Sequence, residues 1–191
     1  MKKCILLVMS FFSLVGCAKN ENGHDHKDIS DEDKAIEFQK GEIKQQGFKK
    51  YKLDDTFYSK NISGKKIKIA VMDTGYDMEN KDISVIKGIN LTSDNLSDVS
   101  DLNGHGTKIA GIIGAKKNNE GLIGIAPESD LYIYKIAYED GAINSDILVK
   151  GIEAAIEDEV NIINLSLEFS EEYPNVTRAL KKASDKGIIL L

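Results

Sequence analysis

Short apolar runs alternate with segments of helical period from residue 64 to residue 191, and this alternation restricts the fold more than any other feature. The runs typical of strands cover residues 67–72, 85–90, 130–136, 161–167 and 188–191. The helical patterns cover a segment that starts at His105, then residues 146–159 and 174–186. Strands that alternate with helices favour crossover connections. We therefore predict an α/β fold, with a parallel sheet and helices on both of its faces.

Local signals mark the ends of two predicted helices. Ser145 precedes the helix of residues 146–159 and is predicted to cap it. Gly187 follows the helix of residues 174–186 and is predicted to end it. In parallel α/β sheets, functional groups gather beyond the carboxyl ends of the strands, so that edge is the expected place for a site.

The N-terminal segment is typical of an export signal. Lys2 and Lys3 precede an apolar run over residues 4–15, which is too short to span a bilayer, and small residues precede Cys17. The pattern resembles the bacterial lipobox, which implies a lipoprotein signal peptide over residues 1–16 and a lipidated Cys17. The mature protein would then be exported and anchored by lipid to the outer face of the cell membrane. A plain secretory signal with a stray cysteine is the alternative.

Composition divides the rest of the chain and narrows its partners. Residues 17–33 are polar and without apolar periodicity, so we predict a flexible tether. Residues 34–63 carry scattered apolar groups and are predicted to be an N-terminal arm or a propeptide remnant. The formal net charge is −6 and no basic stripe is present, which argues against nucleic acid as a partner.

One carboxylate and one imidazole are placed to meet at the edge of the predicted sheet. Asp73 ends the first predicted strand, and His105 starts a helix between Gly104 and Gly106. A carboxylate that holds one imidazole nitrogen fixes the tautomer, so the other nitrogen can take a proton from a nucleophile. The glycines suit a backbone that must approach a neighbour closely or adopt angles closed to other residues.

The motifs around these two residues resemble those of the subtilisin-like serine proteases. The matching segments, in chain order, are residues 71–75 (VMDTG), 104–111 (GHGTKIAG), 124–127 (GIAP) and 163–167 (INLSL). Several ordered motifs at compatible spacing identify residues 64–191 as the amino-terminal part of a subtilisin-like peptidase domain. The resemblance implies a serine endopeptidase that acts on peptide or protein substrates, with a subtilisin-like sheet that is incomplete at its C-terminal side.

The resemblance also assigns roles to individual residues. Asp73 matches the orienting acid and His105 the general base. Ser166 and Leu167 match residues that line the substrate groove, and Gly141 falls in the loop that forms its other wall. The family usually has glycine where this chain has Glu168. That side chain either narrows the groove and favours a basic substrate residue, or points to solvent.

A calcium ion is a further expectation from the resemblance. The loop of residues 116–122 is similar to the calcium loop of the family. The ligands would be the side chains of Asp82 and Asn118 and the backbone oxygens of Lys116, Glu120 and Leu122, a donor set that Ca²⁺ accepts. A plain solvated loop is the alternative, because Lys116 and Lys117 add positive charge beside the site.

Two parts of the catalytic machinery have no match in the 191 residues. In the family, the oxyanion asparagine follows the strand that begins here at residue 188, and a Gly-Thr-Ser nucleophile motif lies further on. This sequence has no Gly-Thr-Ser, and the matched role of Ser166 is to line the groove. We therefore expect a truncated chain that lacks the nucleophilic serine and is inactive alone. The alternative is a non-catalytic pseudoprotease that binds peptides.

Overall fold

The computed structural model describes residues 62–169 and 171–191. The predicted signal peptide, the tether with Cys17 and all but the last two residues of the 34–63 arm lie outside the described residues. The elements, in chain order, are β1 (Lys68–Asp73), β2 (Val85–Asn90), α3 (His105–Gly114), β3 (Asp130–Lys135), α4 (Ser145–Glu157), β4 (Ile162–Asn164), α5 (Pro174–Asp185) and β5 (Ile189–Leu190). No helix within the described residues is long and apolar enough to cross a membrane.

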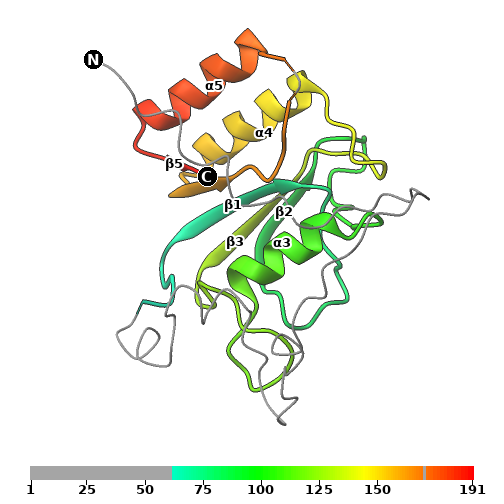
Figure 1. Ribbon diagram of the computed structural model, residues 1–191, viewed down its shortest axis with the longest axis vertical. Coiled ribbons are helices and arrows are strands. Elements are labelled where there is room, and N and C mark those ends of the chain that lie inside the picture. The colour runs from blue at the N-terminus through cyan, green and yellow to red at the C-terminus, as the bar shows by residue number, and fades with distance from the viewer. Residues whose placement is uncertain (1–61, 170) are drawn as a thin grey trace, which may run out of the picture. The chain divides into compact units, whose positions relative to one another are not determined.

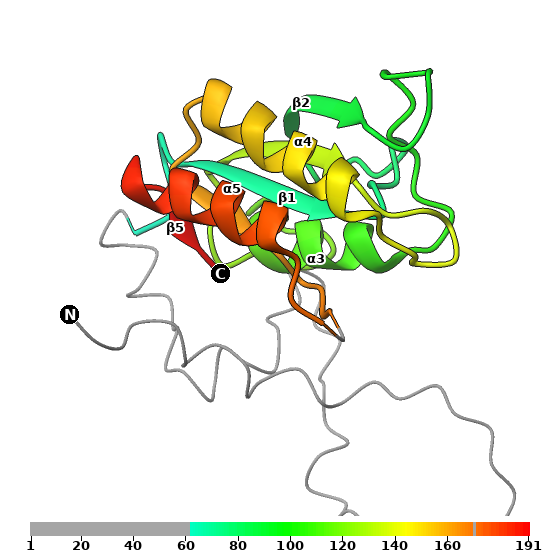
Figure 2. The same ribbon diagram turned by 90° about the horizontal axis from the view of Figure 1, so that it is seen from above.

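The strands of the described residues form one parallel sheet in the order β2-β3-β1-β4-β5. Helix α3 covers one face, and α4 and α5 lie side by side over the other, as Figures 1 and 2 show from two directions. The predicted α/β fold with helices on both faces of a parallel sheet is confirmed.

Alternation along the central strands divides the core into two layers. In β1, Met72 packs with the cluster under α4 and α5, whereas Val71 packs with the cluster under α3. In β3, Tyr134 packs with the cluster under α4 and α5, and Ile133 packs with the cluster under α3. All four of these side chains are completely buried. Successive residues of a strand face opposite sides of a sheet, so an uninterrupted apolar run serves both layers at once.

Two local predictions were wrong. Asn144, and not Ser145, caps α4: its backbone is extended, and its side-chain oxygen accepts hydrogen bonds from the N–H groups of Asp146 and Ile147 at 2.8 and 3.4 Å. Ser145 is the first helical residue. The strand predicted for residues 161–167 is shorter, Ile162–Asn164; Leu165 still donates a backbone hydrogen bond to Leu191, and Ser166 and Leu167 line a cavity.

Candidate active site

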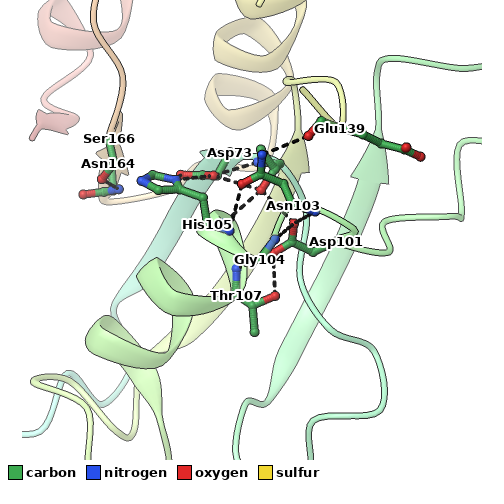
Figure 3. A network of polar contacts seen from close by, with 11 residues as sticks. Asp73, Asp101, Asn103, Gly104, His105, Thr107, Glu139, Asn164 and Ser166 are labelled. Atoms are coloured by element: carbon green, nitrogen blue, oxygen red, sulfur yellow. Dashed lines mark hydrogen bonds and ion pairs between the residues drawn. The ribbon is translucent and has the colours of Figure 1, made fainter. Parts of the chain in front are cut away.

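The structure brings the side chains of Asp73 and His105 together beyond the carboxyl end of β1. The Nδ1 atom of His105 lies 2.8 Å from one carboxylate oxygen of Asp73 and 3.0 Å from the other. The Asp73 side chain is 4% exposed, whereas the His105 side chain is 48% exposed. Figure 3 shows the imidazole with its second nitrogen directed away from Asp73, toward the side where Asn164 and Ser166 lie. A buried carboxylate therefore holds an imidazole that is half exposed.

Thr74 fixes the carboxylate of Asp73 and links it to the start of α3. Its N–H donates to Oδ1 of Asp73 at 2.8 Å. Its hydroxyl oxygen accepts from the N–H of Gly106 at 2.9 Å, and the hydroxyl donates to Asp101 at 2.8 Å. Through Thr74, polar contacts thus join the end of β1 to the first turn of α3 next to the Asp73–His105 pair.

The two glycines that flank His105 have different reasons to be glycine. Gly104 has a φ of +87°, in the left-handed region that disfavours a side chain. Gly106 lies so close to the chain after β1 that a Cβ atom there would come within 2.2 Å of the carbonyl oxygen of Gly75 and 3.2 Å of the Cβ of Asp73. Close approach of the helix to the strand end therefore sets the distance between His105 and Asp73.

Asp101 organises this turn, and sequence reasoning did not single it out as a site residue. One carboxylate oxygen accepts from the hydroxyl of Thr74 and from the N–H groups of Asn103 and Gly104. The other accepts from the N–H and the hydroxyl of Thr107, at 2.8 and 2.6 Å. Figure 3 shows Asp101 beside Gly104, Asn103 and Thr107. An acidic residue just before the first turn of a helix is a known capping signal, and it could have marked this position.

The pKa of Asp101 reflects this set of donors. Partial burial opposes ionisation of the carboxyl, but the hydrogen bonds from Thr107, Gly104 and Thr74 outweigh burial and hold its pKa below the ordinary value. Asp101 is therefore a negative charge at the N-terminus of α3, where the helix dipole also favours one.

The predicted groove residues line the same cavity as the Asp73–His105 pair. The cavity has a volume of about 280 Å³. Its lining includes Asp73, His105, Gly141, Ser166 and Leu167. The hydroxyl oxygen of Ser166 accepts from the side-chain amide of Asn164 at 2.9 Å, and no hydrogen bond joins Ser166 to His105 among the described residues. Ser166 therefore stands as part of the wall and not as a partner of the imidazole.

Four of the five predicted calcium residues, Asp82, Lys116, Asn118 and Glu120, are linked by hydrogen bonds. The side-chain amide of Asn118 donates to the carboxylate of Asp82 at 2.9 Å, and the N–H of Lys116 donates to the carbonyl oxygen of Asp82 at 2.9 Å. The N–H of Glu120 donates to the side-chain oxygen of Asn118. The ammonium of Lys116 donates to a backbone carbonyl, at residue 81. The described residues hold no group of three or more His, Cys, Asp or Glu side chains suited to a metal. A cation here would thus depend on one carboxylate, an amide and backbone oxygens, which is a set that Ca²⁺ accepts.

A buried carboxylate in contact with a half-exposed imidazole, at the carboxyl edge of a parallel α/β sheet, is the arrangement that triad hydrolases use as their acid–base pair. Comparison with known families agrees with this class. Residues 64–191 match the model of the Subtilase family, Peptidase_S8. The chain therefore belongs to the subtilase family of serine proteases.

Individual relatives give the same result. The chain is 41% identical over 133 residues to the intracellular serine protease of Paenibacillus polymyxa, an alignment that covers 67% of this chain and 41% of the relative. It is 38% identical over 140 residues to the major intracellular serine protease of Bacillus subtilis, covering 70% and 44%. It is 34% identical over 131 residues to the subtilisin of Bacillus pumilus, covering 69% and 46%. The chain spans less than half the length of each of these relatives.

Proposed function

We propose that this chain carries the acid–base pair and part of the substrate groove of a serine endopeptidase, with Asp73 as the orienting acid and His105 as the general base. The observation that carries the proposal is the contact of Nδ1 of His105 with both carboxylate oxygens of Asp73, inside the cavity that Gly141 and Ser166 also line. Membership of the subtilase family supports it.

The geometry supports one division of labour in that reaction. The carboxylate of Asp73 accepts a hydrogen bond from Nδ1–H of His105, which leaves the Nε2 lone pair free and stabilises the imidazolium that forms. Nε2 then takes a proton from a hydroxyl nucleophile as its oxygen attacks the substrate carbonyl. No motif in the 191 residues matches the nucleophile or the oxyanion asparagine, so we propose that the chain by itself does not hydrolyse peptides. Non-catalytic peptide binding is the second candidate, and it is favoured by the convergence of groove residues on one cavity.

A tripeptidyl chloromethyl ketone tests the acid–base pair without requiring a serine. We expect Nε2 of His105 to displace chloride from the reagent and form a carbon–nitrogen bond, with loss of the imidazolium proton to solvent. Mass spectrometry of the 191-residue chain reads this out, and His24 and His26 serve as internal controls for undirected alkylation.

We expect the labelling of His105 to be saturable and a competing peptide to protect against it. The rate of alkylation should fall by roughly tenfold or more in Asp73→Asn, because the tautomer of His105 is no longer fixed. A fluorophosphonate should label no serine in the same preparation. Equal alkylation of all three histidines would contradict the proposed pair, and fluorophosphonate labelling that is lost in Ser166→Ala would contradict the proposed inactivity.

We also propose that the loop of residues 116–122 binds Ca²⁺ together with Asp82. The hydrogen bonds of Asp82 with Asn118 and Lys116 support the proposal, because they bring the carboxylate and the loop together. Isothermal titration with CaCl₂ should show one site that disappears in Asp82→Ala and persists in Asp94→Ala, an exposed aspartate elsewhere. The absence of heat with the unaltered chain would exclude the site.

Finally, we propose that the protein is exported and anchored by lipid at Cys17. The support is the sequence alone, with basic residues, a short apolar run and small residues before the cysteine. Growth of an expressing bacterium with an alkyne fatty acid should label the protein. Cys17→Ala should abolish the label. Cys4→Ala should leave the label in place and reduce export only slightly. Labelling that survives Cys17→Ala would exclude this anchor.

A further inference from the structure

Glu168 is an acidic residue in the lining of the cavity that also contains Asp73 and His105. It follows Ser166 and Leu167 on the segment after β4, and all three residues line the cavity with His105. Its side chain is exposed, so a substrate can reach the carboxylate from solvent.

The ionisable side chains of this cavity are Asp73, His105 and Glu168, and no lysine or arginine belongs to its lining. The carboxylate of Asp73 is buried and held by the imidazole and by the N–H of Thr74. Among the described residues, the Glu168 carboxylate makes no hydrogen bond or ion pair. Glu168 therefore contributes an available negative charge to the groove wall, unlike Asp73.

Apolar side chains complete the surface beside this charge. Ile143 and Leu167 belong to the same lining and are partly exposed, whereas Met72 and Ala137, which also belong to it, are buried. A long cationic side chain uses such a surface fully, because its methylene stem covers apolar groups while its charged end reaches a polar partner. A carboxylate binds a guanidinium with two parallel hydrogen bonds, which adds geometric selectivity to the attraction.

We propose that Glu168 makes this groove selective for peptides that carry an arginine or lysine side chain beside the backbone segment presented to His105. The inference rests on the proposed function, because it needs the cavity to bind a peptide. It names the class of substrate: basic peptide segments, bound with the cation on Glu168.

Glu139 offers a matched control for this carboxylate. It is also exposed, and it lies on the loop that leads to Gly141. Its backbone carbonyl accepts from the side chain of Asn103 at 2.9 Å, whereas its side chain points away from His105 (Figure 3). Removing either charge changes the net charge of the protein equally, but only Glu168 lines the cavity of the acid–base pair.

The experiment is a binding titration of the isotope-labelled 191-residue chain, followed by NMR at His105 and Gly141. Two acetylated pentapeptide amides are compared, Ala-Ala-Leu-Arg-Ala and the same peptide with citrulline in place of arginine. Citrulline keeps the shape and removes the charge. Because Glu168 is exposed, we expect a preference for the arginine peptide of about fivefold, which decreases as salt is added.

The variants assign that preference to one residue. Glu168→Gln should bind both peptides equally, whereas Glu139→Gln should keep the preference. Equal affinities of the two peptides for the unaltered chain would overturn the inference and leave peptide binding intact. A preference that persists in Glu168→Gln would also overturn it, since another group would then bind the cation. If neither peptide shifts the signals of His105 and Gly141, the peptide groove itself is wrong and the proposed function fails with it.

Discussion

Substitution of Asp101 by asparagine tests whether this carboxylate holds the turn that presents His105. Asparagine keeps the size of the side chain but replaces one acceptor oxygen with a donor. The best placement of its new NH₂ group is beside Thr107, where the hydroxyl can rotate to accept and only the N–H of Thr107 loses its partner. The remaining oxygen would still accept from Thr74 and Gly104.

The cost follows from these contacts. An N–H that loses its acceptor costs about 1–3 kcal/mol, and the other donors exchange a charged acceptor for a neutral one. Asp101 is only partly buried, so water can replace part of the loss. We expect the free energy of unfolding to fall by about 2 kcal/mol. With a slope of about 2 kcal/mol per molar urea, the unfolding midpoint should move down by about 1 M.

The effect should depend on pH with a defined sign. Because the pKa of Asp101 in the folded chain lies below its unfolded value, its ionisation stabilises the fold above pH about 4. That contribution is lost as the pH falls through the folded pKa. The difference between the unaltered chain and Asp101→Asn should therefore shrink from pH 7 to pH 3.

Urea titrations monitored by circular dichroism and tyrosine fluorescence measure this directly, since the chain contains seven tyrosines and no tryptophan. Asp94→Asn is the matched control, an exposed aspartate for which a change within about 0.5 kcal/mol is expected. A difference below 0.5 kcal/mol for Asp101→Asn at pH 7, or one that is the same at pH 3, would refute the assignment.

Three further substitutions test other parts of the fold by the same urea titration. Gly106→Ala should lower the free energy of unfolding by about 3 kcal/mol, because its Cβ would meet the backbone of Gly75. Gly111→Ala should be neutral or stabilising, because the nearest atom to its Cβ lies at 4.0 Å. Equal effects of the two substitutions would contradict the argument that the helix start approaches the strand end closely. Asn144→Ala should lower the free energy of unfolding by about 1 kcal/mol, and Asn144→Asp by much less, because aspartate also caps helices. No loss in the alanine variant would show that α4 does not need this cap. Burial and the neighbouring Asp158 carboxylate raise the pKa of Tyr134, so its hydroxyl stays protonated and donates to Asp158 at 2.6 Å. Tyr134→Phe should therefore lower the free energy of unfolding by about 1 kcal/mol. The absence of any loss would place that hydroxyl in contact with water.

The strands and helices could be predicted where local patterning decides them. The apolar run before Asp73 and the run of residues 130–136 each fill both faces of a buried strand, so their type follows from composition alone. The helix ends were less predictable. Asn144 and Ser145 are both good caps, and the choice between them depends on backbone angles that the sequence does not encode locally.

The candidate site was predictable to different depths. Asp73 and His105 could be paired, because a strand end and a helix start meet at the same sheet edge. The capping role of Asp101 depends on Thr74 and Thr107 at once, and such a three-way contact arises only after the strand and the helix pack together. The end of β4 at Asn164 likewise depends on tertiary structure, since the apolar alternation continues past it.

The contacts that position His105 involve different residues from those that form the opposite wall of the groove. Asp73, Thr74, Asp101 and Gly106 all lie on the strand end, the loop and the first turn of one continuous segment, residues 73–107. Ser166 lies on the segment that follows β4, and its hydroxyl oxygen accepts a hydrogen bond from Asn164 at the end of β4. Changes at residues 164–168 should therefore alter peptide binding while the Nδ1 contact of His105 persists. Changes at Asp101 should loosen the imidazole while the far wall stays in place. Residues 73–107 are thus sufficient to orient the imidazole, and in the proposed reaction a nucleophile would have to approach an Nε2 atom whose position they already set.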